Sequence, residues 1–222
     1  MSTPANIDNT AVDVRVEKNT LKQLLVRNLS LPPYQRRYCW SEEQVALLLA
    51  DINELLNPSK VNNHVGPTVP LFLGTVILHE QQVNNMPYFD LVDGQQRSLT
   101  LNLLIIALQR YNQVEASGID VYQLLGVAAP NLLKATFTHK GAQQQLASNF
   151  KQIQSFIKGK VWASNEQQLT HLLKHLEFVV ITIHSIDQAF AFFDSQNSSG
   201  KRLSDFDLLK ARHLRGIVSE PA

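Results

Sequence analysis

Residues 99–111 (LTLNLLIIALQRY) predict a helix that is apolar on nearly every side. Such a helix must be covered by protein all round, so we expect it at the centre of the domain. The run YFDLV at 88–92 is typical of a β-strand, and LFLGTVILHE at 71–80 predicts a partner strand. The intervening QQVNNMP indicates a hairpin with a loose tip. Strand and helix are joined only by residues 93–98 (DGQQRS), so polar groups occupy a corner between two buried elements.

Shorter patterns predict the rest of the fold. A helix capped by Thr20 follows an alternating strand, and a capping box of Ser41 with Gln44 begins another helix. We expect strands at 11–16 and 178–183, helices at 42–56, 146–157, 169–176, 186–196 and 205–215, and a loop at 57–70. The fold class is therefore predicted to be α+β, with a small mixed β-sheet, a buried helix after the corner and a largely helical second half.

The length and composition are those of one folded domain. With 222 residues, 44% of them apolar, the chain can bury a sizeable core. We expect a single domain over 1–222, with a core at about 11–111 and a helical extension with a closing motif at about 112–216. The net charge of +1 predicts no overall basic surface, so nucleic-acid binding would need local clusters or a partner domain.

Cys39 is the only cysteine, which excludes an internal disulfide and a cysteine-based zinc site. A reducing cytoplasm is the natural compartment for such a chain. The polar start MSTPANIDNT does not have the order of a signal peptide, and the sequence has no apolar run long enough to span a membrane. We therefore expect a cytoplasmic protein without membrane contact. The chain ends in GIVSEPA just after a basic helical segment, with no stop signal beyond Gly216, so we expect a fragment of a longer protein.

The corner DGQQR is the first candidate for chemistry. A helix start presents unpaired N–H groups and a partial positive charge, which favours phosphate or another anion. Arg97 could add a bidentate guanidinium, Gln95 and Gln96 could hold a base, a sugar or a water, and Gly94 lets backbone approach a ligand. Spacing alone equally fits an ordinary turn at Asp93, with solvated glutamines and an arginine paired to a carboxylate.

Two further segments combine charge with special geometry. In NSSGKRLSDFDLLKAR, residues 197–212, a helix end is followed by basic residues on the next helix, although a capped corner with a solvated basic face would look the same. In PPYQRRYCW, residues 32–40, aromatic rings alternate with arginines, as in surfaces that stack on bases and contact phosphates. Equally, Tyr38 and Trp40 could pack in the core beneath the following helix.

The sequence contains no pattern typical of a catalytic metal site. His171 and His175 are one helical turn apart, but no glutamate follows His171 and no third ligand is evident. We therefore predict no protein-only metal site.

Taken in their order along the chain, the three segments resemble the N-terminal domain of GmrSD-type modification-dependent restriction endonucleases. The resemblance rests on YQRRYCW, on FLGTVILHE leading to YFDLVDGQQRSLTL, and on FFDSQNSSGKRLSDFDLLKAR, and it spans about 29–214. It implies a core similar to ParB and sulfiredoxin, and a regulatory domain of phage defence that binds and hydrolyses a nucleoside triphosphate. Because such hydrolysis usually needs a magnesium ion, we expect Mg²⁺ as the cofactor. The resemblance further implies modified DNA and an HNH-type nuclease domain, in cis or in trans, as partners, with that nuclease domain absent from this chain.

The resemblance also implies roles for particular residues. The catalytic pocket would contain Asp93, Gln95, Gln96 and Arg97, and the nucleotide or phosphate would also contact Gly94, Ser98, Thr100, Asn197, Lys201, Asp207 and Lys210. Tyr34, Gln35 and Arg36 would line the same pocket or form the DNA-sensing face. The family usually continues DGQQR with Leu-Thr-Thr-Leu, whereas this chain has Ser-Leu-Thr-Leu at 98–101, a departure that bears on hydrolysis more than on binding.

Two alternatives remain open from the sequence. The pocket could recognise modified DNA without chemistry and signal to a nuclease, or the domain could cut DNA itself as some ParB-like proteins do. The second alternative lacks a visible carboxylate cluster. The sequence also leaves open whether the chain forms a homodimer.

Overall fold

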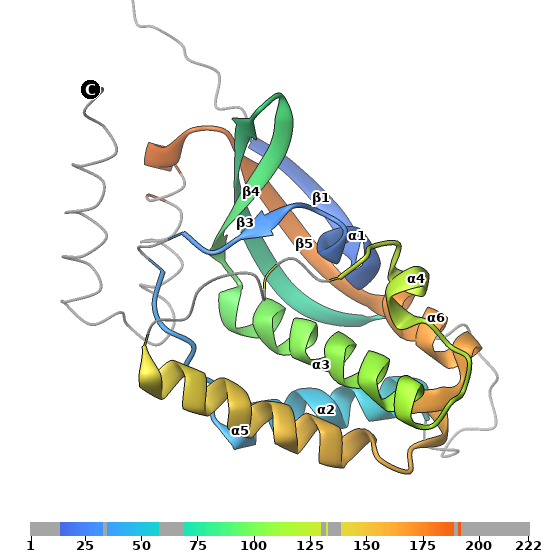
Figure 1. The fold of residues 1–222 in the computed structure, drawn as a ribbon. Helices are drawn as coiled ribbons and strands as arrows, with labels where there is room; N and C mark the ends of the chain where they lie inside the picture. Colours follow the sequence, from blue (N-terminus) through green and yellow to red (C-terminus); the bar gives the residue numbers. More distant parts are fainter. Residues whose placement is uncertain are drawn as a thin grey trace, which may run out of the picture.

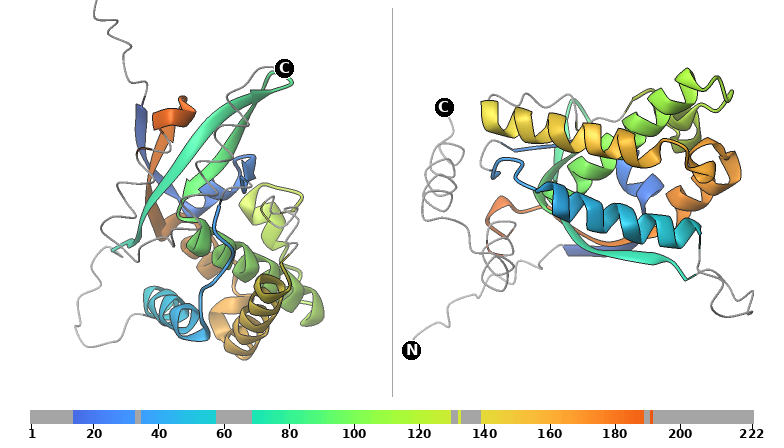
Figure 2. Two further views of the ribbon diagram at one scale, coloured as in Figure 1. Left: turned by 90° about the vertical axis from the view of Figure 1, so that its left-hand side faces the viewer. Right: turned by 90° about the horizontal axis from the view of Figure 1, so that it is seen from below.

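A five-stranded mixed sheet packs against a group of helices (Figures 1 and 2). The structure is a computed structural model that describes residues 14–32, 35–57, 69–129, 132, 139–188 and 191. The predicted α+β class is confirmed. The strands are β1 (Val14–Thr20), β2 (Leu29–Ser30), β3 (Leu71–Val83), β4 (Met86–Asp93) and β5 (Leu176–Ile183), and the helices are α1 (Leu21–Leu25), α2 (Glu42–Leu56), α3 (Gln95–Val114), α4 (Val121–Leu125), α5 (Lys140–Ile157), the 3-10 helix η2 (Val161–Ser164) and α6 (Glu166–His175).

The strand order is β1-β5-β3-β4-β2, with both parallel and antiparallel pairs. β5 runs antiparallel to β1 and parallel to β3, while β4 runs antiparallel to β3 and parallel to β2. The predicted β3–β4 hairpin is confirmed. The prediction of a loose tip is wrong, because strand pairing continues to Val83 and Met86. Asn84 and Asn85, with φ of 53° and 60°, form a tight two-residue turn, since asparagine tolerates positive φ.

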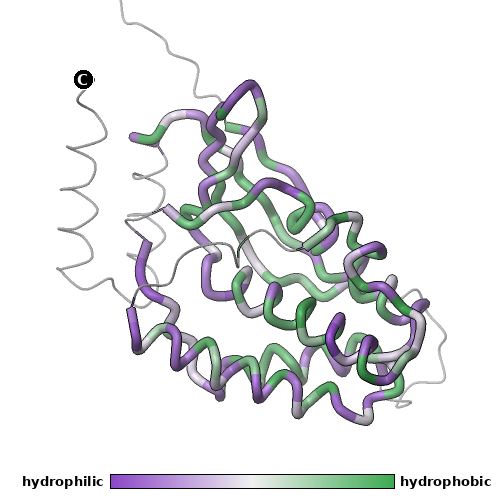
Figure 3. Tube along the Cα trace, viewed as in Figure 1, coloured by the Kyte–Doolittle hydropathy of each residue, from purple (hydrophilic) through white to green (hydrophobic). Residues whose placement is uncertain are grey.

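Helix α3 is the buried helix that the sequence predicts. Its residues Leu99, Leu101 and Leu108 are fully buried within the main hydrophobic core between the sheet and the helices. The first turn of α3 is hydrophilic, whereas the middle of the helix is largely hydrophobic (Figure 3). Within the described part of the chain, no helix combines the length and the apolar character needed to cross a membrane.

Most predicted elements are confirmed with shifted ends. Helix α2 begins with the expected capping box, and α5, α6 and β5 cover the helices and the strand expected in the second half. β1 continues to Thr20, which also caps α1 as predicted. The short elements β2, α4 and η2 were not predicted. The helices expected at 186–196 and 205–215 lie largely or wholly outside the described residues.

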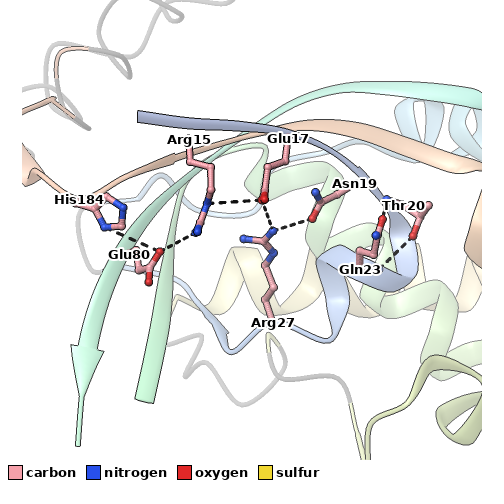
Figure 4. A network of polar contacts seen from close by, with 8 residues as sticks. All are labelled: Arg15, Glu17, Asn19, Thr20, Gln23, Arg27, Glu80 and His184. Carbon is pink, nitrogen blue, oxygen red and sulfur yellow. Dashed lines mark hydrogen bonds and ion pairs between the residues drawn. The ribbon is translucent and has the colours of Figure 1, made fainter. Parts of the chain in front are cut away.

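A network of polar contacts joins β1 to the turn after α1 (Figure 4). Arg27 donates hydrogen bonds to Oε2 of Glu17 and Oδ1 of Asn19, each at 2.9 Å. Its guanidinium carbon also lies 5.2 Å from the centre of the Phe89 ring, within the range of a cation–π contact. This partly buried cation therefore has an anionic, a neutral polar and an aromatic partner.

Candidate functional site

The predicted strand-to-helix corner is present, and one glycine makes it. Gly94 follows β4 directly, has a φ of 86° and precedes the first residue of α3. A Cβ here would lie 3.0 Å from Cγ2 of Val76 and 3.4 Å from the carbonyl oxygen of Thr75. The left-handed backbone and the close approach both favour glycine. Because glycine has no side chain to cap the helix, the first N–H groups of α3 remain uncapped.

A cavity of about 130 Å³ lies at this corner. It brings the corner together with the loop at 35–40, so two of the three segments singled out in the sequence meet there. Sequence reasoning did not assign Thr75 or Trp40 to this site. The lining residues are Gln35, Arg36, Trp40, Thr75, Asp93, Gly94, Gln95, Gln96 and Arg97.

Arg97 is a partly buried cation with no hydrogen bond or ion pair to the other described residues. Burial lowers the pKa of its guanidinium, and the nearby carboxylate of Asp93 offsets part of this effect. The guanidinium lies against the backbone of Gly74, since a Cβ built there would be 3.2 Å from Nη1 of Arg97. Arg97 thus faces the cavity with its charge weakly compensated.

The two glutamines of the motif have different environments. The side-chain oxygen of Gln96 accepts hydrogen bonds from the backbone N–H groups of Cys39 at 2.8 Å and Trp40 at 3.3 Å. Its Nε2 donates to the carbonyl oxygen of Arg37 at 3.1 Å. All of these bonds go to the loop beside the cavity, so Gln96 holds the loop in place. Its predicted part in catalysis stays a prediction.

Gln95 lacks such partners. Its residue is 6% exposed, and its Oε1 is buried with no hydrogen-bond partner among the described residues. A buried amide oxygen without a donor is unfavourable by about 1–3 kcal/mol, so such atoms usually acquire a partner. Gln95 lines the cavity and is therefore the glutamine whose amide is available to a ligand.

A chain of hydrogen bonds connects the loop to α3 and α5. Nδ2 of Asn149 donates to the Tyr38 hydroxyl at 2.9 Å and to the carbonyl oxygen of Trp40 at 2.8 Å. The Thr100 hydroxyl donates to the carbonyl oxygen of Gln96 at 2.9 Å, so the Tyr38 hydroxyl must donate in its 2.8 Å contact with Thr100. Burial raises the pKa of Tyr38, which keeps this donor protonated. Tyr38 packs in the core, as one of the two interpretations of its segment predicted.

Gln35 joins the same loop to the sheet. Its Nε2 donates to the carbonyl oxygen of Val92, the β4 residue that an irregularity in the β3–β4 ladder leaves without a partner on β3. Gln35 is 8% exposed and lines the cavity, as does the more exposed Arg36. Their predicted role in sensing DNA stays a prediction.

Two residues predicted to contact phosphate are buried and do not line the cavity. Ser98 is fully buried, its hydroxyl has no partner among the described residues, and it does not line the cavity. Thr100 is 1% exposed, and its hydroxyl bonds both Tyr38 and Gln96. The remaining predicted residues lie outside the described part of the chain, and their roles stay predictions. They are Tyr34, Asn197, Lys201, Asp207 and Lys210.

The corner, its uncapped helix start and the adjacent loop all lie within the region matched by a known family. Residues 18–214 match the model of the GmrSD restriction endonuclease, N-terminal domain. The chain belongs to this family. A search among curated proteins finds no match to it. Membership confirms the resemblance seen in the sequence and supports a role in defence against phage.

Proposed function

We propose that this domain binds a nucleoside triphosphate at the corner between β4 and α3, hydrolyses it, and thereby regulates a nuclease that acts on modified DNA. The observation that carries this proposal is the environment of Arg97. Its guanidinium borders a cavity, is partly buried and has no hydrogen-bond or ion-pair partner among the described residues.

A charge in that position favours an anionic ligand. Buried charges in proteins are normally paired, because a group removed from water loses its hydration. Arginine does not deprotonate in proteins, so the lowered pKa of Arg97 leaves it a cation. An anion in the cavity would supply the partner that the described residues do not provide. A phosphate group would match the guanidinium fork with two parallel hydrogen bonds.

The backbone supports the same ligand. The uncapped N–H groups at the start of α3 add a partial positive charge beside Arg97. Gly94 brings backbone to the cavity without a side chain that would fill it. Guanidinium and helix start together form a cradle for the terminal phosphates, and Trp40 and Arg36 supply an aromatic face and a second cation beside it.

Asp93 is the residue that would hold a Mg²⁺ ion. Its carboxylate lines the cavity and has no hydrogen bond or ion pair to other residues in the described ranges. One carboxylate together with substrate phosphates is a common ligand set for Mg²⁺, so the residue fits the ion. When bound, Mg²⁺ would neutralise charge on the phosphates.

Hydrolysis also needs a group that orients the attacking water. Gln95 fits this role better than Gln96, because the Gln96 amide is already bonded to three backbone groups. The buried Oε1 of Gln95 can accept a hydrogen bond, and its residue adjoins the phosphate cradle. Arg97 would stabilise the charge on the transferred phosphoryl group.

The test is a calorimetric titration of the protein with each of the four nucleoside triphosphates in Mg²⁺, combined with phosphate release. Adenosine, which lacks phosphates, is the matched control ligand. We expect saturable binding of at least one triphosphate, no binding of adenosine alone, and turnover that stops when EDTA removes the metal. Absence of binding for all four triphosphates would overturn the proposal.

A second candidate is a sensor of modified DNA without chemistry of its own. Arg36 borders the cavity and Arg37 is exposed on the same loop, and neither forms an ion pair with the other described residues. Two such cations beside Trp40 could contact a DNA backbone. Saturable binding of modified duplex DNA, without any nucleotide binding or turnover, would favour this candidate over the first.

A further inference from the structure

An irregularity in the sheet lies directly beneath Arg97. In the parallel β3–β5 ladder, Phe72 pairs with Glu177 and Thr75 pairs with Val179. Three steps along β3 therefore span two steps along β5, so β3 carries one extra residue at this point. Bulges in parallel pairs are rare, and in general bulges occur next to functional sites, where they redirect a side chain.

Gly74 lies in this bulge and has a φ of +90°. A Cβ at Gly74 would lie 3.2 Å from Nη1, 3.5 Å from Nη2 and 3.6 Å from Cζ of Arg97, so all of its nearest neighbours belong to the guanidinium. Gly74 itself does not line the cavity. The guanidinium thus packs directly against the bulged backbone, and the absence of a side chain at Gly74 allows this close approach.

We propose that Gly74 is a positioning residue for the ligand-binding cation: the bulge and the absent Cβ together set where the Arg97 guanidinium lies relative to the start of α3. This inference rests on the proposed function of the cavity. It adds a determinant of affinity located on β3, a strand that the DGQQR motif does not include.

An alanine at 74 would act in two separable ways. The left-handed backbone would be strained by any Cβ, whatever its surroundings. The Cβ would also force the guanidinium away, since a contact of 3.2 Å is tighter than such atoms normally allow. Only the second effect belongs to the proposal, because strain alone would lower stability without changing the ligand site.

The chain offers a matched control for the strain. Gly126 also has a φ of +90°, but among the described residues the only heavy atom near a Cβ there is the Lys22 Cε at 4.0 Å. Gly74→Ala and Gly126→Ala therefore carry a similar backbone penalty, and only the first reaches Arg97. We expect Gly74→Ala to weaken triphosphate binding by roughly threefold to tenfold, because the guanidinium must move by a few tenths of an ångström from its position beside the start of α3. Gly126→Ala should bind within about twofold of the wild type, a difference of less than about 0.5 kcal/mol.

A double-mutant cycle in thermal unfolding tests the contact without any ligand. Arg97→Ala removes the three described atoms that lie nearest to the new Cβ. In that background Gly74→Ala should lower Tm only as much as Gly126→Ala does, whereas in the wild-type background it should lower Tm more. Equal losses in both backgrounds would overturn the inference. If the cycle shows coupling but the wild type binds no triphosphate, the proposed function fails, while the placement of Arg97 by Gly74 stands.

Discussion

Two partly buried arginines in this domain have opposite surroundings. Arg27, after α1, bonds Glu17 and Asn19 (Figure 4). Its guanidinium also lies over the Phe89 ring. Arg97, at the start of α3, has no such partner among the described residues and borders a cavity. The side chains are chemically identical, so the difference lies in what the fold places around them.

The difference distinguishes a charge that stabilises the fold from a charge that is placed to bind a ligand. A paired cation contributes to the folded state, because removing it strands its partners. An unpaired one lowers the stability of the ligand-free protein and gains its partner only when a ligand binds. Substituting the same residue at the two sites should therefore change different properties, which the following predictions exploit.

Arg97→Met should have the largest effect of the predicted substitutions, and this effect should be on the affinity for the triphosphate. Methionine keeps an unbranched apolar stem but removes the fork that would bond phosphate, so triphosphate affinity should fall by about 3 kcal/mol, roughly a hundredfold in Kd. The unfolding free energy of the ligand-free protein should stay equal or rise, since a charge without a partner among the described residues is removed from a partly buried site. Calorimetric titration and urea unfolding measure the two quantities. A clear loss of stability with full affinity would reverse the assignment of Arg97.

The contrast between these arginines shows what sequence can and cannot predict. The apolar pattern of residues 99–111 was sufficient to predict a buried helix, and the polar run before it predicted the corner. The bulge at Gly74 depends on pairing between β3 and β5, which are distant in the chain, so no local pattern shows it. The glycine inside a strand pattern was the only available signal, since such glycines often mark bulges.

The same limit applies to the glutamines and to the short elements. Gln95 and Gln96 are identical in sequence terms, and only the position of the loop at 37–40 decides which amide is satisfied. β2, α4 and η2 are each too short to carry a periodic pattern, and they depend on tertiary packing. Sequence therefore located the site and its residue types, whereas the partners of each polar group required the fold.

Arg27→Met should have the next largest effect, and this effect should be on the free energy of unfolding. It leaves the buried Asn19 amide oxygen without its donor and the Glu17 carboxylate with its longer ion pair to Arg15 at 3.8 Å, which costs about 1–2 kcal/mol after allowing for the partial exposure of Glu17. Affinity for the triphosphate should remain within about twofold of the wild type, since that corresponds to less than about 0.5 kcal/mol. Urea unfolding checks the first statement and titration the second. Loss of affinity equal to that of Arg97→Met would show that the two regions are not independent.

The smallest effects are expected for the adjacent glutamines, where the same comparison recurs within one turn of helix. Gln96→Leu removes the acceptor of the Cys39 and Trp40 N–H groups and the donor to Arg37, so the protein should lose about 1 kcal/mol of stability. Gln95→Leu removes an oxygen that has no partner among the described residues, so the ligand-free protein should be as stable as the wild type or slightly more stable.

Turnover discriminates further between the two leucine variants. Gln95→Leu should lower kcat for triphosphate hydrolysis by roughly tenfold or more with a smaller change in KM, because a water-orienting group acts mainly in the transition state. Gln96→Leu should raise KM instead, since the loop that carries Trp40 and Arg36 would lose three of its hydrogen bonds to α3 and be held there more loosely. Steady-state kinetics of both variants in Mg²⁺ provide the measurement. If Gln96→Leu instead lowered kcat at constant KM and constant stability, the catalytic glutamine would be Gln96, and the three backbone bonds of its amide would have to open during turnover.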